Sequence, residues 1–228
     1  MVGHCYHRTS LAIGPENTVV ATCDQEIVEY VASIGGRTVM TSSEHERATS
    51  RVAEAVGLLE SEQGGRIDTV AMIQGDEPLV DPESLGRVVE CMNDPDVQIA
   101  NLVYSTSDPR VIFDPNNVKV VIDRCRDALY FSRAAIPSAM NSGTAHSALI
   151  QTGIIVFRRE ALFGFAELEE TDLERIESID MNRVLEHGGQ IRTVLSDTAL
   201  IGVDTPEDLS LAERLLMADP VSQSYCAQ

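Results

Sequence analysis

The stretch VAMIQGDEPLV, residues 70–80, is an apolar run that ends in glycine, two adjacent carboxylates and a proline. Its first half is typical of a strand buried on both faces. Pro78 cannot donate a hydrogen bond to a central ladder, so we expect the strand to end near Gln74. Asp76 and Glu77 then lie at the carboxyl end of a strand, where open α/β sheets bind their ligands.

Composition limits the class of protein. The chain has 228 residues, of which 43% are hydrophobic, and this suits a single α/β domain over residues 1–228. No apolar run approaches the roughly 20 residues that span a bilayer, and from the first residues we expect no signal peptide. The formal charge of −19 argues against a nucleic-acid partner. Five scattered cysteines, an odd number without a CxxC pair, favour a reducing cytoplasm. We expect a cytoplasmic protein with no membrane or nucleic-acid partner.

Strand-like and helix-like runs alternate along most of the chain. This rhythm predicts an α/β fold with a doubly wound, mostly parallel sheet. The expected strands are 17–22, 37–41, 68–74, 97–105, 149–157 and 191–195, and the expected later helices are 172–187 and 205–217. We expect the tail from Asp219 to fray.

The rhythm breaks in the middle of the chain. The runs 117–123 and 128–133 are separated by only four residues, which predicts a β-hairpin inserted into the parallel scheme. Polar, turn-rich sequence follows, so we expect a surface excursion over about 105–148. The apolar run 149–157 returns to the core.

A second carboxylate follows another apolar run, in GVDTPEDL at 202–209. Thr205, Pro206 and Asp208 make a good helix start, and this local role does not need Asp204. Aspartates at two strand ends suit a Mg²⁺ ion shared with a polyphosphate, since Mg²⁺ uses few protein carboxylates and fills its octahedron with phosphate oxygens and water. The sequence thus predicts that Asp76 and Asp204 converge on one metal site.

Four motifs in order resemble the CMP-Kdo synthetases, the 3-deoxy-manno-octulosonate cytidylyltransferases. They are QGDEP at 74–78, DPNNVKVV at 114–121, YFSRAAIP at 130–137 and GVDTPEDL at 202–209. The resemblance implies the nucleotide-diphospho-sugar transferase fold and transfer of CMP from CTP to a 3-deoxy sugar acid, with release of pyrophosphate. It also implies a Mg²⁺ cofactor, a homodimer built around the hairpin, and a role in lipopolysaccharide biosynthesis.

The resemblance assigns roles to individual residues. Asp76 and Asp204 are implied to hold Mg²⁺ and to be the catalytic pair. Arg133 is expected to bind the acid's carboxylate, because a guanidinium fork matches a carboxylate in two-pronged fashion. Gln74 can both donate to and accept from a sugar hydroxyl.

Other segments resemble the family only in part. The segment 40–56 resembles the cytidine-pocket motif H-x-S-G-T-x-R and supplies the expected nucleotide-binding residues His45, Arg47, Thr49 and Arg51, although Arg47 and Ala48 replace serine and glycine. The expected substrate-binding residues further along the chain are Gln151, Glu177 and Asp180. Gln151 replaces a histidine and Asp180-Met181 replaces Glu-Gln, so we expect Kdo or a related acid as the substrate.

The family's opening strand and phosphate loop, A-R-x-x-S-x-R-x-P-G-K, have no counterpart, because Met1 aligns after them. We therefore expect a chain that is N-terminally truncated relative to the family. The strands beginning at Asn17 and holding Gln74 would then have unpaired edges. We also expect this chain to be poorly soluble and to bind CTP weakly.

Two other classes of function stay open at this point. A non-catalytic binding protein could keep the fold and lose the phosphate loop. A nucleotidyltransferase for another base or another acidic substrate is compatible with Arg47-Ala48 in the base pocket.

Overall fold

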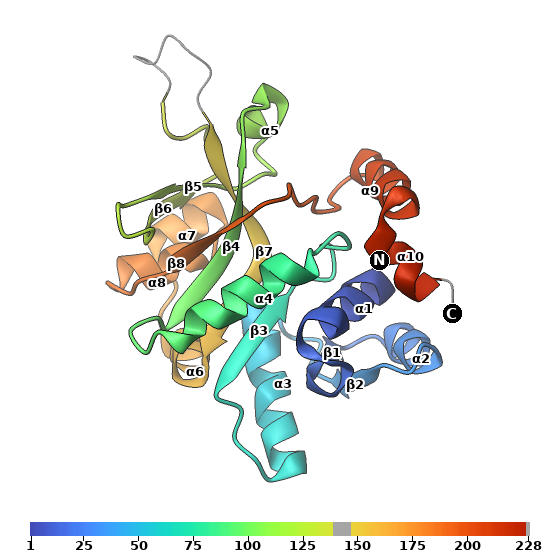
Figure 1. Cartoon of the computed structure of the whole chain (residues 1–228). Coiled ribbons are helices and arrows are strands. Elements are labelled where there is room, and N and C mark those ends of the chain that lie inside the picture. Colours follow the sequence, from blue (N-terminus) through green and yellow to red (C-terminus); the bar gives the residue numbers. More distant parts are fainter. Residues whose placement is uncertain (139–146, 227–228) are drawn as a thin grey trace.

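A computed structural model describes residues 1–138 and 147–226, and Figure 1 shows the arrangement of its elements. The strands are β1 (Val19–Thr22), β2 (Arg37–Met40), β3 (Thr69–Ile73), β4 (Ile99–Thr106), β5 (Lys119–Ile122), β6 (Ala128–Ser132), β7 (Ala148–Arg158) and β8 (Arg192–Ser196). The α-helices are α1 (Val2–Ile13), α2 (Gln25–Ser33), α3 (Ala48–Gln63), α4 (Pro82–Glu90), α5 (Pro109–Phe113), α6 (Arg159–Glu167), α7 (Asp172–Glu177), α8 (Met181–Glu186), α9 (Pro206–Ala218) and α10 (Pro220–Cys226), with short 3₁₀ turns at Pro15–Asn17 and Cys91–Asn93. Within this part of the chain no helix is both long and apolar enough to cross a bilayer.

The large sheet is organised around β7, its longest strand. Its strand order is β6-β5-β7-β4-β8, and β3 pairs with β7 as well. On one side β7 pairs with β4 along most of its length; on the other it pairs with β5 at Leu149 and Ile150 and with β3 from Ile154 to Arg158. Strands β5 and β3 thus share one edge of β7. Neither strand has a ladder partner on β7 between residues 150 and 154.

The expected α/β class is confirmed, but the pairing differs from a mostly parallel sheet. Strands β3, β4, β5 and β8 run in one direction, as the β-α-β rhythm predicts, while β7 runs against β3, β4 and β5. Most ladders of the large sheet are therefore antiparallel. The reason is the connection: β7 follows the excursion rather than a crossover helix, and parallel neighbours need such a crossover.

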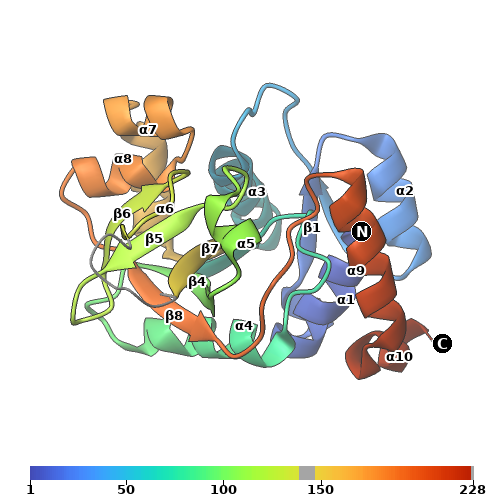
Figure 2. The same ribbon diagram turned by 90° about the horizontal axis from the view of Figure 1, so that it is seen from above.

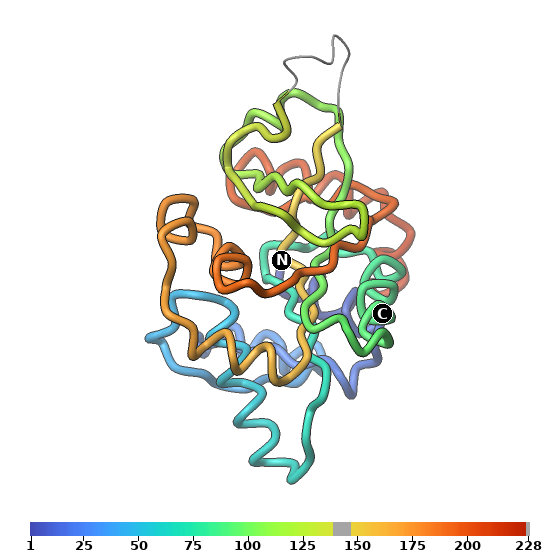
Figure 3. Tube along the Cα trace, turned by 90° about the vertical axis from the view of Figure 1, so that its left-hand side faces the viewer, coloured from blue at the N-terminus to red at the C-terminus, as the bar shows by residue number. Residues whose placement is uncertain are grey.

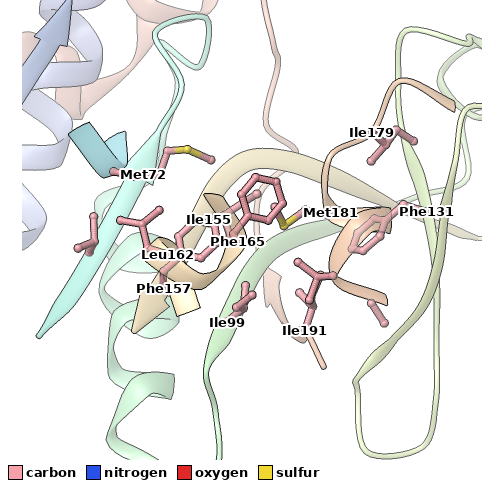
Figure 4. Close-up of a cluster of buried hydrophobic side chains, with 14 of the residues drawn as sticks. Met72, Ile99, Phe131, Ile155, Phe157, Leu162, Phe165, Ile179, Met181 and Ile191 are labelled. Carbon is pink, nitrogen blue, oxygen red and sulfur yellow. The ribbon is translucent and has the colours of Figure 1, made fainter. Parts of the chain in front are cut away.

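Helices cover both faces of this sheet (Figure 2). Helix α4 packs on one face, while α3, α6 and α8 pack on the other. Side chains of β3 alternate between the two layers: Val70 and Met72 join the α3 and α6 side, whereas Ala71 and Ile73 join the α4 side. Figure 4 shows the first layer, where Phe157, Leu162 and Phe165 lie beside Met72 and Ile155. Burial of apolar side chains on both faces of the sheet stabilises β3, so the residues that follow its end are held in a fixed position.

Strands β1 and β2 form a separate two-stranded parallel sheet. No ladder joins β1 to β3 in the described part of the chain, and both strands line the same large cavity. The expectation that these two edges are unpaired is thus confirmed.

The hairpin expected at 117–123 and 128–133 is formed by β5 and β6. Figure 3 shows the chain around it as a lobe at one end of the molecule. The excursion expected over about 105–148 includes residues 139–146, which lie outside the described residues.

Two expectations about the later helices are wrong in detail. The helix predicted over 172–187 is divided into α7 and α8, because Ser178 adopts a left-handed conformation (φ 54°) and ends α7. The tail from Asp219 does not fray but forms α10, which packs beside α1 (Figure 1). The buried Arg8 guanidinium holds this contact, since it donates to Asp219 at 2.5 Å and to Ser222 at 3.2 Å.

Two hydrogen bonds at the ends of β3 show which of its backbone N–H and C=O groups face β7. The amide of Gln74 donates to the carbonyl of Gly153, and the carbonyl of Asp68 accepts from the amide of Arg159. Because neighbouring residues of a strand point their backbone groups to opposite sides, the even-numbered residues of β3 face β7. The odd-numbered residues face the cavity that separates β3 from β1.

Hydrogen exchange measured by NMR tests this arrangement. We expect the amides of Ala71 and Ile73 to exchange about a hundredfold or more faster than those of Val70 and Met72, since only the latter pair is held in the core ladder. Equal protection of all four amides would show that the free edge of β3 is covered in solution.

Candidate active site

The candidate site lies where β3 and β5 separate along β7. Gln151, Thr152 and Gly153 occupy this part of β7, and a cavity of ≈ 1490 Å³ opens over it. The loop after β3 forms one wall and the loop before β5 forms another. This is the kind of position where α/β sheets bind ligands, since strand ends leave a crevice between diverging neighbours.

Gly153 permits the close approach of the loop after β3. A Cβ at this position would lie 2.9 Å from the Cβ of Gln74, so a larger residue would push the loop away. The Gly153 amide donates to Glu77 Oε1 at 2.7 Å, and its carbonyl accepts from the Gln74 amide at 3.0 Å. Both backbone groups of one glycine therefore fix the QGDEP turn.

Asp76 and Asp204 both lie at this turn, but the expected strand end before Asp204 is wrong: residues 199–204 form no strand, and only Asp76 follows one, β3. The amide of Val203, next to Asp204, donates to the carbonyl of Asp76 at 2.9 Å, and both aspartates line the cavity. Burial raises the pKa of Asp76, and the negative charge of Asp204 raises it further. The charge of Asp204 therefore acts on the carboxyl group of Asp76.

The pair fits a magnesium ion by an observation independent of the motif. Asp76 Oδ1 is buried without a hydrogen-bond partner. A buried carboxylate oxygen that lacks a donor is costly unless a ligand satisfies it. No cluster of three or more His, Cys, Asp or Glu suited to a metal occurs in the described ranges. Two carboxylates are what Mg²⁺ uses when phosphates supply other ligands.

Glu77 also lines this cavity, although sequence analysis assigned no specific role to it. It is buried, and burial raises its pKa to about 7, with smaller contributions from the charges of Asp76 and Asp204. Its Oε2 has no hydrogen-bond partner. In the sequence, only its position next to Asp76 pointed to Glu77. Its contact with the Gly153 amide of β7 became visible only in the structure.

Arg133 lines the opposite wall of the cavity. Its Nε donates to the carbonyl of Glu177 at 2.8 Å and its Nη1 to the carbonyl of Pro115 at 2.9 Å. Two of the three guanidinium nitrogens are thus fixed by backbone carbonyls, and Nη2 has no acceptor among the described residues.

Glu177 supports this wall rather than lining the cavity. Its carboxylate accepts from Tyr130 at 2.8 Å, from Ser132 at 2.7 Å and from the Arg133 amide at 2.9 Å. These contacts lower the pKa of Glu177 against the opposing effect of burial. Its acceptor sites are filled by β6, so its arrangement fits a structural role.

The expected nucleotide segment divides into two groups. Arg47 and Arg51 line the cavity, whereas His45 and Thr49 do not. His45 Nε2 lies 2.5 Å from Glu54 Oε2, and Arg51 Nη2 donates to the His45 carbonyl at 3.3 Å. His45 therefore ties the loop before α3 to the helix itself.

The remaining expected residues lie at or beside the cavity. Thr49 is buried and donates to Asp180 Oδ2 at 2.7 Å, which joins the start of α3 to the start of α8. Gln74, Gln151 and Asp180 line the cavity. Burial raises the pKa of Asp180, and the Thr49 hydroxyl and Arg47 oppose this effect.

Sequence comparison identifies relatives of the chain. The family profile for cytidylyltransferases matches residues 1–193. The 3-deoxy-manno-octulosonate cytidylyltransferase of Solibacter usitatus is 38% identical over 219 residues, which cover 96% of this chain and 84% of that protein. The enzyme of the same description from Syntrophus aciditrophicus is 38% identical over 218 residues, covering 95% and 87% of the two chains.

Structure comparison agrees with these relatives. A solved structure described as CMP:2-keto-3-deoxy-manno-octonic acid synthetase complexed with CTP matches with a TM-score of 0.84 and 33% identity, covering 95% of this chain and 87% of that one. The chain therefore belongs to the cytidylyltransferase family, among relatives described as 3-deoxy-manno-octulosonate cytidylyltransferases.

Proposed function

We propose that this chain transfers CMP from CTP to 3-deoxy-manno-octulosonate, with release of pyrophosphate. The observation that carries the proposal is one cavity with the carboxylates of Asp76 and Asp204 on one wall and Arg133 on another. A carboxylate pair suits a metal-bound polyphosphate, and a guanidinium suits a sugar acid. The relatives described above support the same reaction.

The reaction needs positioning more than covalent catalysis. The acid's anomeric hydroxyl oxygen forms a bond to the α-phosphorus of CTP, the bond to the bridging oxygen breaks, and pyrophosphate leaves with that oxygen. Negative charge builds on the phosphoryl oxygens and the leaving group, so cations must lie beside them. The hydroxyl loses its proton as the new bond forms.

We propose that Asp76 and Asp204 hold Mg²⁺. When bound, the ion supplies positive charge to the phosphoryl oxygens and aligns the displacement. The unpartnered Oδ1 of Asp76 supports this role. Glu77, whose pKa is raised to about 7, adds little negative charge beside the pair below neutral pH.

We assign the two substrates to opposite parts of the cavity. Arg47 and Arg51, on the α3 side, are suited to the nucleotide. Arg133 would bind the acid's carboxylate through its free nitrogen, and Gln74 and Gln151 would contact sugar hydroxyls. His45, Thr49 and Glu177 would act indirectly, by holding these walls.

We also propose that the reaction takes place in the cytoplasm and serves lipopolysaccharide synthesis. All five cysteines are free, as expected in a reducing compartment. The described relatives support the assignment to this group of enzymes.

A pyrophosphate-release assay on the 228-residue chain tests the function. It uses Mg²⁺, millimolar CTP to allow for weak nucleotide binding, and 3-deoxy-manno-octulosonate. UTP, ATP and GTP replace CTP in parallel reactions, and related 3-deoxy acids replace the sugar, because Gln151 and Asp180 raise the question of a related acid. Binding of CTP without turnover of any acid would favour the non-catalytic alternative.

Asp76→Asn tests the metal pair directly. We expect turnover to fall about a hundredfold or more, because a contribution of several kcal/mol from the metal is lost. Thermal stability without divalent ions should stay the same or rise, since burial raises the pKa of Asp76 and the change removes an unfavourable buried charge. Activity and calorimetric unfolding provide the two measurements.

The exposed Glu90→Gln on α4 is the matched control, because it removes one negative charge away from the cavity. It should leave both turnover and stability nearly unchanged. Full activity of Asp76→Asn would contradict the assignment of Asp76.

A homodimer around the excursion is a further part of the proposal. Strand β6 lies at the edge of the sheet and carries Leu129, which is 62% exposed; Phe113 on α5 is 72% exposed. A two-fold contact would cover such an edge. We expect light scattering to give twice the mass of 24.8 kDa at micromolar concentration.

Leu129→Glu should convert this dimer to a monomer. Leu11→Glu, at a 55% exposed leucine on α1, should leave it intact. A wild-type chain that is monomeric at micromolar concentration would contradict the dimer.

A further inference from the structure

Lys119 is the only lysine in the sequence; every other side chain among the 17 lysines and arginines is an arginine. It begins β5, and none of its surface is exposed. A buried ammonium is unfavourable unless its hydrogen bonds are satisfied. The described ranges contain no ion pair between Lys119 and a carboxylate, so neutral groups must satisfy it.

Three backbone carbonyls surround the ammonium. Lys119 Nζ donates to the carbonyls of Asp114 at 2.9 Å, Asn117 at 2.6 Å and Arg133 at 2.6 Å. An ammonium has three donors and no acceptor, so all its hydrogen bonds are used. A planar guanidinium directs its donors differently, which gives a reason for lysine here in a chain that otherwise uses arginine.

The same loop is also held by Arg133. Its Nη1 donates to the carbonyls of Pro115 at 2.9 Å and Asn116 at 3.5 Å. Four consecutive carbonyls, from Asp114 to Asn117, therefore point at two cations. Lys119 binds the outer pair and the Arg133 backbone, while the Arg133 side chain binds the inner pair.

We propose that Lys119 is a positioning residue for Arg133. It joins the 114–117 loop to the Arg133 backbone, and Nη2 of the guanidinium has no acceptor among the described residues. Asn116, Asn117 and Arg133 all line the cavity, so the joined loops form its acid-binding wall. The identity of the ligand, the carboxylate of the sugar acid, rests on the proposed function. The geometry of Lys119 and Arg133 does not depend on it.

Steady-state kinetics on the full chain tests this coupling. Lys119→Met and Lys119→Arg should each raise the KM for the acid about 10- to 100-fold, the effect of weakening one charge-assisted hydrogen bond, with little change in the KM for CTP. Lys119→Arg keeps the charge but not the tetrahedral donors, so it should fail as Lys119→Met does. An unchanged acid KM in both variants would overturn the proposal.

A double-mutant cycle separates positioning from general stability. In an Arg133→Ala background, Lys119→Met should change the acid KM by less than about twofold, because a residue that acts through Arg133 loses its effect when Arg133 is absent. Additive effects would overturn the proposal. An unmodified chain that turns over no acid would instead count against the proposed function.

Chemical labelling tests the coupling without turnover. Of the two amines in the chain, acetic anhydride should modify only the terminal amine in the native protein and also Lys119 after unfolding, as measured by site-resolved mass spectrometry. Arg133→Ala should make Lys119 reactive in the folded protein, because the carbonyls of the loop lose their second cation. The exposed Arg124→Ala in the turn of the same hairpin is the control and should leave Lys119 protected. Equal protection in Arg133→Ala and the control would overturn the coupling.

Discussion

The antiparallel course of β7 is the constraint on which the rest of the structure depends. One long strand pairs with β4 on one side and with two shorter strands, β3 and β5, on the other. The edge between those two strands cannot be filled by a ladder, so the backbone of Gly153 binds the QGDEP turn instead. The cavity, the carboxylates of Asp76 and Asp204 and the wall that holds Arg133 all meet at this break in pairing.

Local patterns predicted much of this fold because strand and helix periods are set by short-range burial. The end of β3 near Gln74, the hairpin of β5 and β6, and the capping box at Thr205 follow from adjacent residues, and the structure has all three. The direction of β7 could not be predicted in this way. The residues 149–157 are the same whether a crossover helix or the excursion precedes them. The preceding connection alone determines which neighbours of β7 are antiparallel.

The candidate site shows the same division between local and long-range information. Asp76, Asp204 and Arg133 could be identified because each follows an apolar run within a recognisable motif, and the fold brings them to one cavity. His45 and Thr49 matched the cytidine-pocket motif and Glu177 was an expected substrate-binding residue, yet their polar atoms contact Glu54, Asp180 and β6. A motif specifies a residue type at a position, whereas competition among neighbours decides whether its side chain is left for a ligand. The role of Lys119 could not be predicted from the sequence, because its three acceptors are backbone carbonyls, which every residue type carries.

The partners of the arginines explain how a chain of formal charge −19 can attract two anionic substrates. Away from the cavity, the guanidinium groups of Arg159, Arg183 and Arg192 pair with carboxylates, which cancel their charge. At the cavity, Arg51 donates to a threonine hydroxyl and two carbonyls, and Arg133 donates to carbonyls alone. Neutral oxygens hold these guanidinium groups in place, and neither forms an ion pair with a described residue, although the charges of Glu54 and Glu177 interact with Arg51 and Arg133. A favourable local potential can then exist within an acidic molecule, because interactions beyond about 8–10 Å are largely screened at ordinary ionic strength.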